Sequence, residues 1–87
     1  MENTFYYQVN NITFISNTKQ VTLGDKVKAY RKRACLSQLQ LELMTDLSEG
    51  SICRIESNSI NPTKETILRL SKALKLSREE IIDLFGI

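Results

Sequence analysis

The fold of this chain is decided by the stretch from Ser37 to Ile55, which reads SQLQLELMTDLSEGSICRI. It divides into two short segments with apolar residues at helical spacing, separated by a connection of a few residues around Asp46. A capping-box pair, Ser37 with Gln40, opens the first segment, and the hydroxyl of Ser48 can cap the second. The stretch therefore predicts two short helices joined by a tight turn.

Three further helix starts lie on either side of this stretch. Two of them repeat the capping-box pattern, Thr22 with Asp25 and Ser77 with Glu80. The third is the hydroxyl of Thr63, which follows Pro62 and so begins where a preceding helix must end. The five starts, at Thr22, Ser37, Ser48, Thr63 and Ser77, leave room for helices of two to three turns with tight connections.

Apolar stripes with the helical period support these starts. They comprise Leu23, Val27, Tyr30 and Ala34, then Ile67, Leu70, Ser71 and Leu74, and finally Ile81, Ile82 and Phe85. We predict an all-α fold for residues 22–87, a compact bundle of five short helices with a modest core.

The first 21 residues differ from the rest. They hold four of the six aromatic residues, four of the six asparagines and almost no charge. Residues 5–9 and 12–15 suggest two strands about a two-residue asparagine turn, a register that opposes Val9 to Ile12 and Tyr7 to Phe14. We expect an N-terminal extension, residues 1–21, that forms a β-hairpin. The extension is either a tail that covers the bundle or is disordered, or an arm for dimerisation or partner binding.

The composition excludes several classes of protein. The chain has 87 residues, no histidine, and a net charge of +2, which permits nucleic-acid binding without arguing for it. Two cysteines, Cys35 and Cys53, cannot form a cysteine-rich zinc site. No apolar run approaches the roughly 20 residues that cross a bilayer, and no signal peptide opens the chain. We expect a cytoplasmic protein with reduced thiols, no metal, no cofactor and no enzymatic activity.

Two short helices about a tight turn are the arrangement of a helix-turn-helix, whose second helix can enter a DNA major groove. The residues that carry a wider pattern are Leu36, Ser37, Gln38, Leu41, Leu47, Ser48, Ile52, Arg54, Ile55, Glu56, Asn61, Pro62, Thr63, Glu65, Thr66, Ile67, Leu70 and Leu74. In order and spacing the chain resembles, over residues 22–85, the lambda-repressor-like, XRE-type (Cro/repressor) helix-turn-helix family.

The resemblance implies a sequence-specific regulator of transcription that binds double-stranded DNA, a repressor by family habit, acting as a homodimer. The helix starting at Ser48 would enter the major groove. The implied DNA-contacting residues are Gln38, Ser48, Glu49, Gly50, Ser51, Arg54, Ser59 and Asn61. Arg31 and Glu56 match the family's structural ion pair between the first and third helices. The cations Lys26, Lys28, Lys32 and Arg33 are either a solvated face or a contribution to DNA approach.

Some residues depart from the family pattern. Glu42 stands where the family has a small residue, and Asp46 stands where it has glycine, although Asp can adopt the left-handed conformation of such a turn. Leu39, Leu43 and Met44 occupy positions that the family leaves polar. Either the helix is rotated, or the hairpin or a partner protein covers these side chains. The alternative function is therefore a protein-interaction module, or an antitoxin-like protein, that binds through the extension or the second helix.

Overall fold

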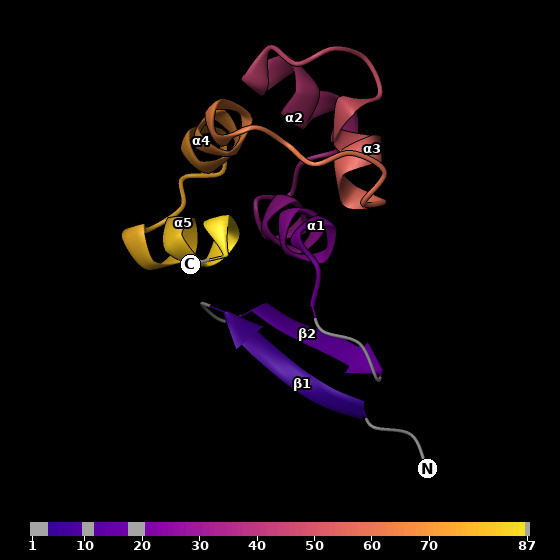
Figure 1. Ribbon diagram of the computed structural model, residues 1–87. Coiled ribbons are helices and arrows are strands. Elements are labelled where there is room, and N and C mark those ends of the chain that lie inside the picture. Colours follow the sequence, from indigo (N-terminus) through magenta and orange to yellow (C-terminus); the bar gives the residue numbers. More distant parts are fainter. Residues whose placement is uncertain (1–3, 10–11, 18–20, 87) are drawn as a thin grey trace.

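Five short helices surround one apolar core in this computed structural model, and a two-stranded hairpin precedes them (Figure 1). The structure describes residues 4–9, 12–17 and 21–86, and of the two strands the backbone alone. The elements are β1 (Thr4–Val9), β2 (Ile12–Asn17), α1 (Leu23–Arg33), α2 (Gln38–Thr45), α3 (Ser51–Glu56), α4 (Lys64–Ala73) and α5 (Arg78–Phe85). The predicted five-helix bundle is confirmed. None of the helices in the described part of the chain is long and apolar enough to span a membrane.

Four of the five predicted helix starts are the observed N-caps. Thr22, Ser37 and Ser77 each form a complete capping box, and the Thr63 hydroxyl accepts from the Thr66 amide. In these positions one side chain satisfies a backbone donor that the helix itself leaves unpaired. Asp46 ends α2 in the left-handed conformation, with a φ of 57°, as predicted for that turn.

The start of α3 is predicted wrongly. The helix begins at Ser51, with Gly50 as its N-cap, and not at Ser48. Gly50 has a φ of 80°, a left-handed conformation that no residue inside an α-helix can adopt. Residues 48–51 instead form a turn in which the Ser51 amide donates to the Ser48 carbonyl at 3.1 Å. The helix is therefore only six residues long and has no side-chain cap of its own.

The core draws on all five helices. Its fully or nearly buried members are Val27, Tyr30, Leu41, Ile52, Ile55, Ile67, Leu70, Leu74 and Leu84. The first two apolar stripes are largely confirmed, and the third is confirmed in part, because Phe85 packs against the core and Ile81 is half-buried. Helix α5 buries Glu80 and Leu84, whereas Ile82 is exposed. Residues four apart share one helix face, and the face of α5 that meets the bundle is the one that carries these two residues.

Two connections in the bundle have the same local structure. After α1, Cys35 adopts a φ of 60° and the Leu36 amide donates to the Arg31 carbonyl at 3.2 Å. After α4, Lys75 adopts a φ of 54° and the Leu76 amide donates to the Ser71 carbonyl at 3.0 Å. Both are helix ends of the Schellman type. Each is followed by a serine that caps the next helix, so both turns are tight.

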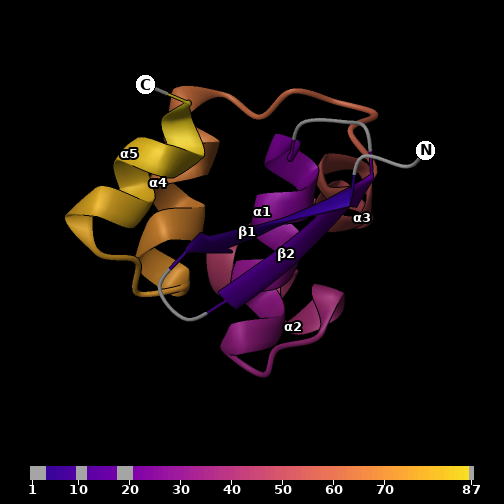
Figure 2. The ribbon, with the colours of Figure 1, turned by 90° about the horizontal axis from the view of Figure 1, so that it is seen from below.

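The two strands pair in the predicted register. Val9 opposes Ile12 and Tyr7 opposes Phe14 in an antiparallel hairpin. The predicted turn at Asn10 and Asn11 lies outside the described residues. Strand β2 contacts α1, and the hairpin crosses that helix on the side away from α2 (Figures 1 and 2). The hairpin therefore covers the first helix and leaves α2 and α3 uncovered.

Two leucines on α2 provide a test of this core. Leu41 is fully buried, so Leu41→Ala should lower the free energy of unfolding by about 2–5 kcal/mol through lost burial and a cavity. Leu39 lies on the same helix but is 61% exposed, so Leu39→Ala should change it by no more than about 0.5 kcal/mol. Urea unfolding followed by circular dichroism measures both. Equal losses would contradict the burial of Leu41.

Candidate nucleic-acid interface

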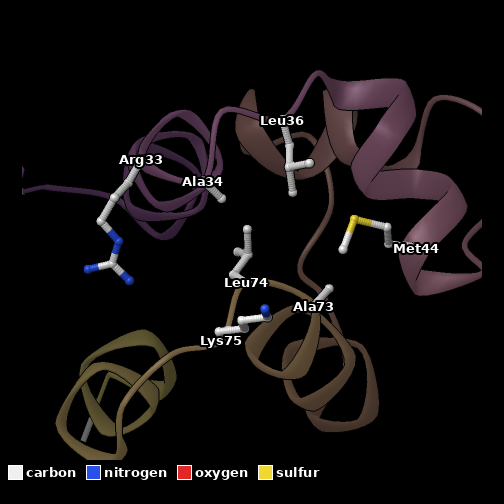
Figure 3. Close-up of a pocket in the computed structure, with 7 residues that line it drawn as sticks. All are labelled: Arg33, Ala34, Leu36, Met44, Ala73, Leu74 and Lys75. Atoms are coloured by element: carbon white, nitrogen blue, oxygen red, sulfur yellow. The ribbon is translucent and has the colours of Figure 1, made fainter.

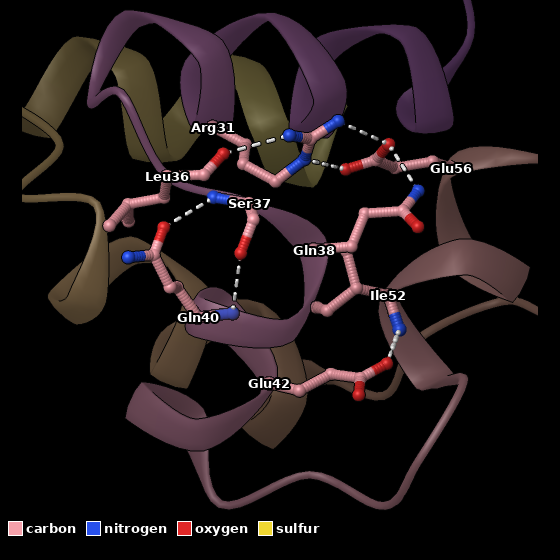
Figure 4. Close-up of polar contacts among 8 residues, drawn as sticks. All are labelled: Arg31, Leu36, Ser37, Gln38, Gln40, Glu42, Ile52 and Glu56. Atoms are coloured by element: carbon pink, nitrogen blue, oxygen red, sulfur yellow. Dashed lines mark hydrogen bonds and ion pairs between the residues drawn. The ribbon is translucent and has the colours of Figure 1, made fainter.

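The Arg31 guanidinium joins three parts of the bundle (Figure 4). Its Nε and Nη2 donate to the two carboxylate oxygens of Glu56, at 2.6 and 3.1 Å, and its Nη1 donates to the Leu36 carbonyl at 2.8 Å. Both side chains of the ion pair are at most one-tenth exposed. The hydrogen bond with Glu56 raises the pKa of Arg31 above its ordinary value, so the guanidinium remains charged. Arg31 thus ties α1 both to the end of α3 and to the connection before α2.

Gln38, at the first position of α2, extends this network. Its Nε2 donates to Glu56 Oε1 at 3.1 Å. A primary amide has two N–H donors, and this contact uses one of them. The first turn of α2 and the last turn of α3 are therefore held to the same carboxylate. Gln38 is half-buried, so its amide lies between the network and the surface.

Glu42 holds the other end of α3. Its side chain is buried, and its Oε2 accepts from the Ile52 amide at 3.3 Å (Figure 4). Gly50 offers no side chain to cap α3, so this carboxylate from α2 satisfies a donor that the helix leaves unpaired. Sequence reasoning missed this contact and noted only that Glu42 replaces a small residue. The absence of a capping side chain at Gly50 is the signal that could have revealed it.

The predicted DNA-contacting residues before α3 fall into two groups. Ser48 and Glu49 are exposed, and Gly50 is half-buried. Ser51 is buried, which corrects the expectation that it belongs to an exposed helix start. Its hydroxyl lies 2.8 Å from the Ser48 hydroxyl. Since α3 begins only at Ser51, and Ser51 and Ile52 are both buried, the surface here is formed by the preceding turn and by Arg54.

Arg54 is exposed on α3 and folds back over this turn. Its Nη2 donates to the Glu49 carbonyl at 3.0 Å. A Cβ atom at Gly50 would lie 2.7 Å from Arg54 Nη1. Gly50 is favoured by its positive φ, whereas the guanidinium is the far end of a flexible side chain and can move aside. The exposed turn and the guanidinium form one surface unit, which we call the α3 surface: Ser48, Glu49, Gly50 and Arg54.

The connection after α3 contributes Ser59 and Asn61, which are both exposed. The Ser59 amide donates to the Arg54 carbonyl at 2.9 Å, and its hydroxyl lies 2.8 Å from that of Ser57. These contacts fix the start of the connection close to the end of α3. Of the eight predicted DNA-contacting residues, the structure thus brings Ser48, Glu49, Gly50, Arg54 and Ser59 to α3 and its flanks, with Gln38 beside Glu56.

Sequence reasoning also missed a second join between α1 and α3. A Cβ atom at Gly24 would lie 2.4 Å from the Glu56 carbonyl oxygen, so only glycine permits this approach. The Gly24 amide donates to Asn58 Oδ1 at 3.1 Å, and Asn58 Nδ2 donates to Thr22 Oγ1 at 3.1 Å. Asn58 has a φ of 62°, which asparagine tolerates. The N-cap of α1 is therefore bonded to the chain that leaves α3.

Two cations of α1 are engaged within the fold. Lys26 forms an ion pair with Asp83 at 3.2 Å, and Arg33 pairs with Glu80; both acids lie on α5. These two side chains fasten α1 to α5, while Lys28 and Lys32 remain exposed. Among the residues described, no cluster of acidic or cysteine side chains could hold a metal ion.

A family model described as Helix-turn-helix matches residues 27–81. This chain belongs to the helix-turn-helix family, of the lambda-repressor-like, XRE type. The family is one of DNA-binding regulators and not a class of enzymes. A similar sequence is the immunity repressor protein of Bacillus phage phi105, 32% identical over 62 residues, or 71% of this chain. The chain spans only 43% of the length of that repressor.

Solved structures of similar fold include two of the P22 c2 repressor. Its DNA-binding domain has a TM-score of 0.66 at 29% identity, covering 74% of this chain and 86% of that one. The same repressor bound to a synthetic operator has a TM-score of 0.62 at 32% identity, covering 72% and 94%. The restriction-modification controller protein C.AhdI from Aeromonas hydrophila has a TM-score of 0.65 at 26% identity, covering 70% and 92%.

The Arg31 network can be tested by a pair of neighbouring substitutions. Arg31→Ala leaves the Glu56 carboxylate buried without its guanidinium, so the free energy of unfolding should fall by about 3–5 kcal/mol. Lys32→Ala removes the next cation along α1, which is exposed, and should cost no more than about 0.5 kcal/mol. Urea unfolding at neutral pH gives both values. A loss for Arg31→Ala as small as that for Lys32→Ala would refute the network's role.

Proposed function

We propose that this protein is a sequence-specific regulator of transcription that inserts α3, with the turn before it, into the major groove of double-stranded DNA. The observation that carries the proposal is the α3 surface, held at both ends by buried contacts and standing exposed beside α2. The likeness to a repressor solved on a synthetic operator, over 72% of this chain, supports it. A rigid helix end with exposed polar side chains is what base reading requires.

Specific roles follow from the contacts. Arg54 is the candidate base reader, because a guanidinium can bond guanine O6 and N7 as a fork, and Glu49 can accept from cytosine N4. Ser48, Ser59 and Asn61 are candidates for phosphate contacts, as is Gln38 through its remaining amide donor. Ser51 is buried, so it is not among the proposed contact residues.

We further propose that the protein acts as a homodimer and as a repressor. One six-residue helix reads too few base pairs for useful specificity, and a dimer doubles the reading surface. The half-sites would then lie about 34 Å apart, one turn of DNA. The repressor role is supported by the immunity repressor and the P22 repressor among the similar proteins. In this proposal residues 22–87 form the DNA-binding domain, and residues 1–21 form an extension to it.

Selection from a random pool of duplex DNA tests this function. The full chain, incubated with the pool at low and at moderate salt, should retain and enrich one motif with two-fold symmetry. The spacing of its halves should be close to one helical turn. Weak retention that vanishes as salt rises, with no enriched motif, would be the result of non-specific phosphate contacts alone and would overturn the proposal.

Substitution of Arg54 tests its role as the base reader. Arg54→Ala should weaken binding to the enriched motif by about 1–3 kcal/mol and relax the preference at one base pair. Arg54→Lys keeps the charge but loses the fork, so it should also relax that preference. Arg78→Ala, a cation on α5, is the control and should bind as the unaltered protein does. If Arg54→Lys and the unaltered protein had the same affinities for the enriched motif and for its single-base variants, Arg54 would be a phosphate contact only.

A second function, binding of a protein partner, is favoured by one observation. Leu39, Leu43 and Met44 on α2 are all more than half exposed, and neither the hairpin nor a rotation of the helix covers them. We propose partner binding through α2 as an addition to DNA binding, the combination expected of an antitoxin-like protein.

A further inference from the structure

Leu39, Leu43 and Met44 are the large apolar side chains exposed on α2, and we call them the α2 patch. Leu39 and Leu43 lie four residues apart on one helix face, and Met44 follows Leu43 in the sequence. Their side chains are 61, 74 and 54% exposed. The hairpin lies on the other side of α1 and leaves the α2 patch open (Figure 1). Grouped large apolar side chains on a small protein mark an interaction surface more often than an idle one.

Met44 also forms one wall of a hollow between α2 and the ends of α1 and α4 (Figure 3). The hollow has a volume of about 410 Å³. Its lining is mainly aliphatic and consists of Arg33, Ala34, Leu36, Met44, Ala73, Leu74 and Lys75. A space of this size accepts a bulky apolar group. Met44 belongs both to the α2 patch and to the lining of the hollow.

The edge of the hollow is basic. Lys75 is exposed there, and none of the ion pairs found between residues 21–86 includes it. Arg33 is paired with Glu80, so that pair contributes little net charge. The C-terminal ends of α1 and α4 carry partial negative charge, which offsets the charge of Lys75 only in part.

We propose that the α2 patch and the hollow bind a segment of a partner protein, an amphipathic helix that carries large apolar side chains and at least one carboxylate. One apolar side chain enters the hollow beside Met44, and the carboxylate meets Lys75. The other apolar side chains cover Leu39 and Leu43. This proposal rests on partner binding as the second proposed function, and it names the binding surface and the chemistry of the partner.

A second copy of this chain is the alternative occupant. It offers a carboxylate and an apolar side chain together at Glu79 and Ile82 of α5, both of which are exposed. Self-association is therefore an outcome of the test and not the proposal.

A phage-displayed library of random dodecapeptides, selected on the full chain, tests the proposal. The enriched peptides should carry large apolar residues at helical spacing together with Asp or Glu. Met44→Glu and Lys75→Glu should each weaken their binding by about tenfold or more. Lys28→Glu reverses an exposed charge on α1 outside the hollow, so it should leave peptide binding within about twofold of the unaltered protein.

Two further readouts separate the outcomes. Met44 and Lys75 are exposed, so both variants should remain folded, as circular dichroism would show, and should retain the DNA enriched in the pool experiment. No enriched peptide would overturn partner binding at this surface together with the proposed chemistry. Enriched peptides without acidic residues, or indifferent to Lys75→Glu, would overturn the chemistry alone. A smaller sedimentation coefficient for Met44→Glu than for the unaltered protein would make a second copy the occupant and overturn the proposal.

Discussion

The position of α3 depends on one buried guanidinium. A helix of six residues cannot form by itself in water, because the cost of nucleation exceeds what so few hydrogen bonds return. Its direction must therefore be imposed from outside. Arg31 does this at the last turn by holding Glu56, and the same guanidinium holds the Leu36 carbonyl before α2. The first turn is held by Glu42 of α2. The exposed α3 surface thus inherits its rigidity from the two preceding helices.

The acidic residues of this region have different environments, and this changes the electrostatics at the proposed DNA surface. Glu56 is paired with Arg31, and Glu42 is buried against the Ile52 amide. Neither carboxylate stands on the surface that would meet phosphate. Asp46 and Glu49 remain exposed. In the proposed complex these two carboxylates would repel the phosphate backbone, so we expect fewer favourable phosphate contacts and a modest non-specific affinity.

Arg54 and Glu49 illustrate how the α3 surface combines rigidity with exposure. The hydrogen bond from the guanidinium to the Glu49 carbonyl leaves the Glu49 side chain free of that contact and the guanidinium on the outside. An arginine already ordered in this way loses less conformational entropy on binding than a free one does. The side chains of the α2 patch also stand on an ordered element, a helix with a complete capping box, so less conformational entropy is lost when they bind.

The sequence by itself determined four helix starts, the αL turn at Asp46 and the strand register, because each depends on contacts within a few residues. A capping box or a turn is set by side chains three positions apart, whatever the rest of the fold does. The sequence alone did not determine where α3 begins, that Ser51 is buried or that Ile82 faces solvent. Nor did it determine that Glu42 caps a helix ten residues away. Only the tertiary structure decided these, because the relevant partners come from other helices. The periodicity of a helix shows that it has an apolar face, but the packing of its neighbours selects which face is buried and which polar atoms inside must be satisfied.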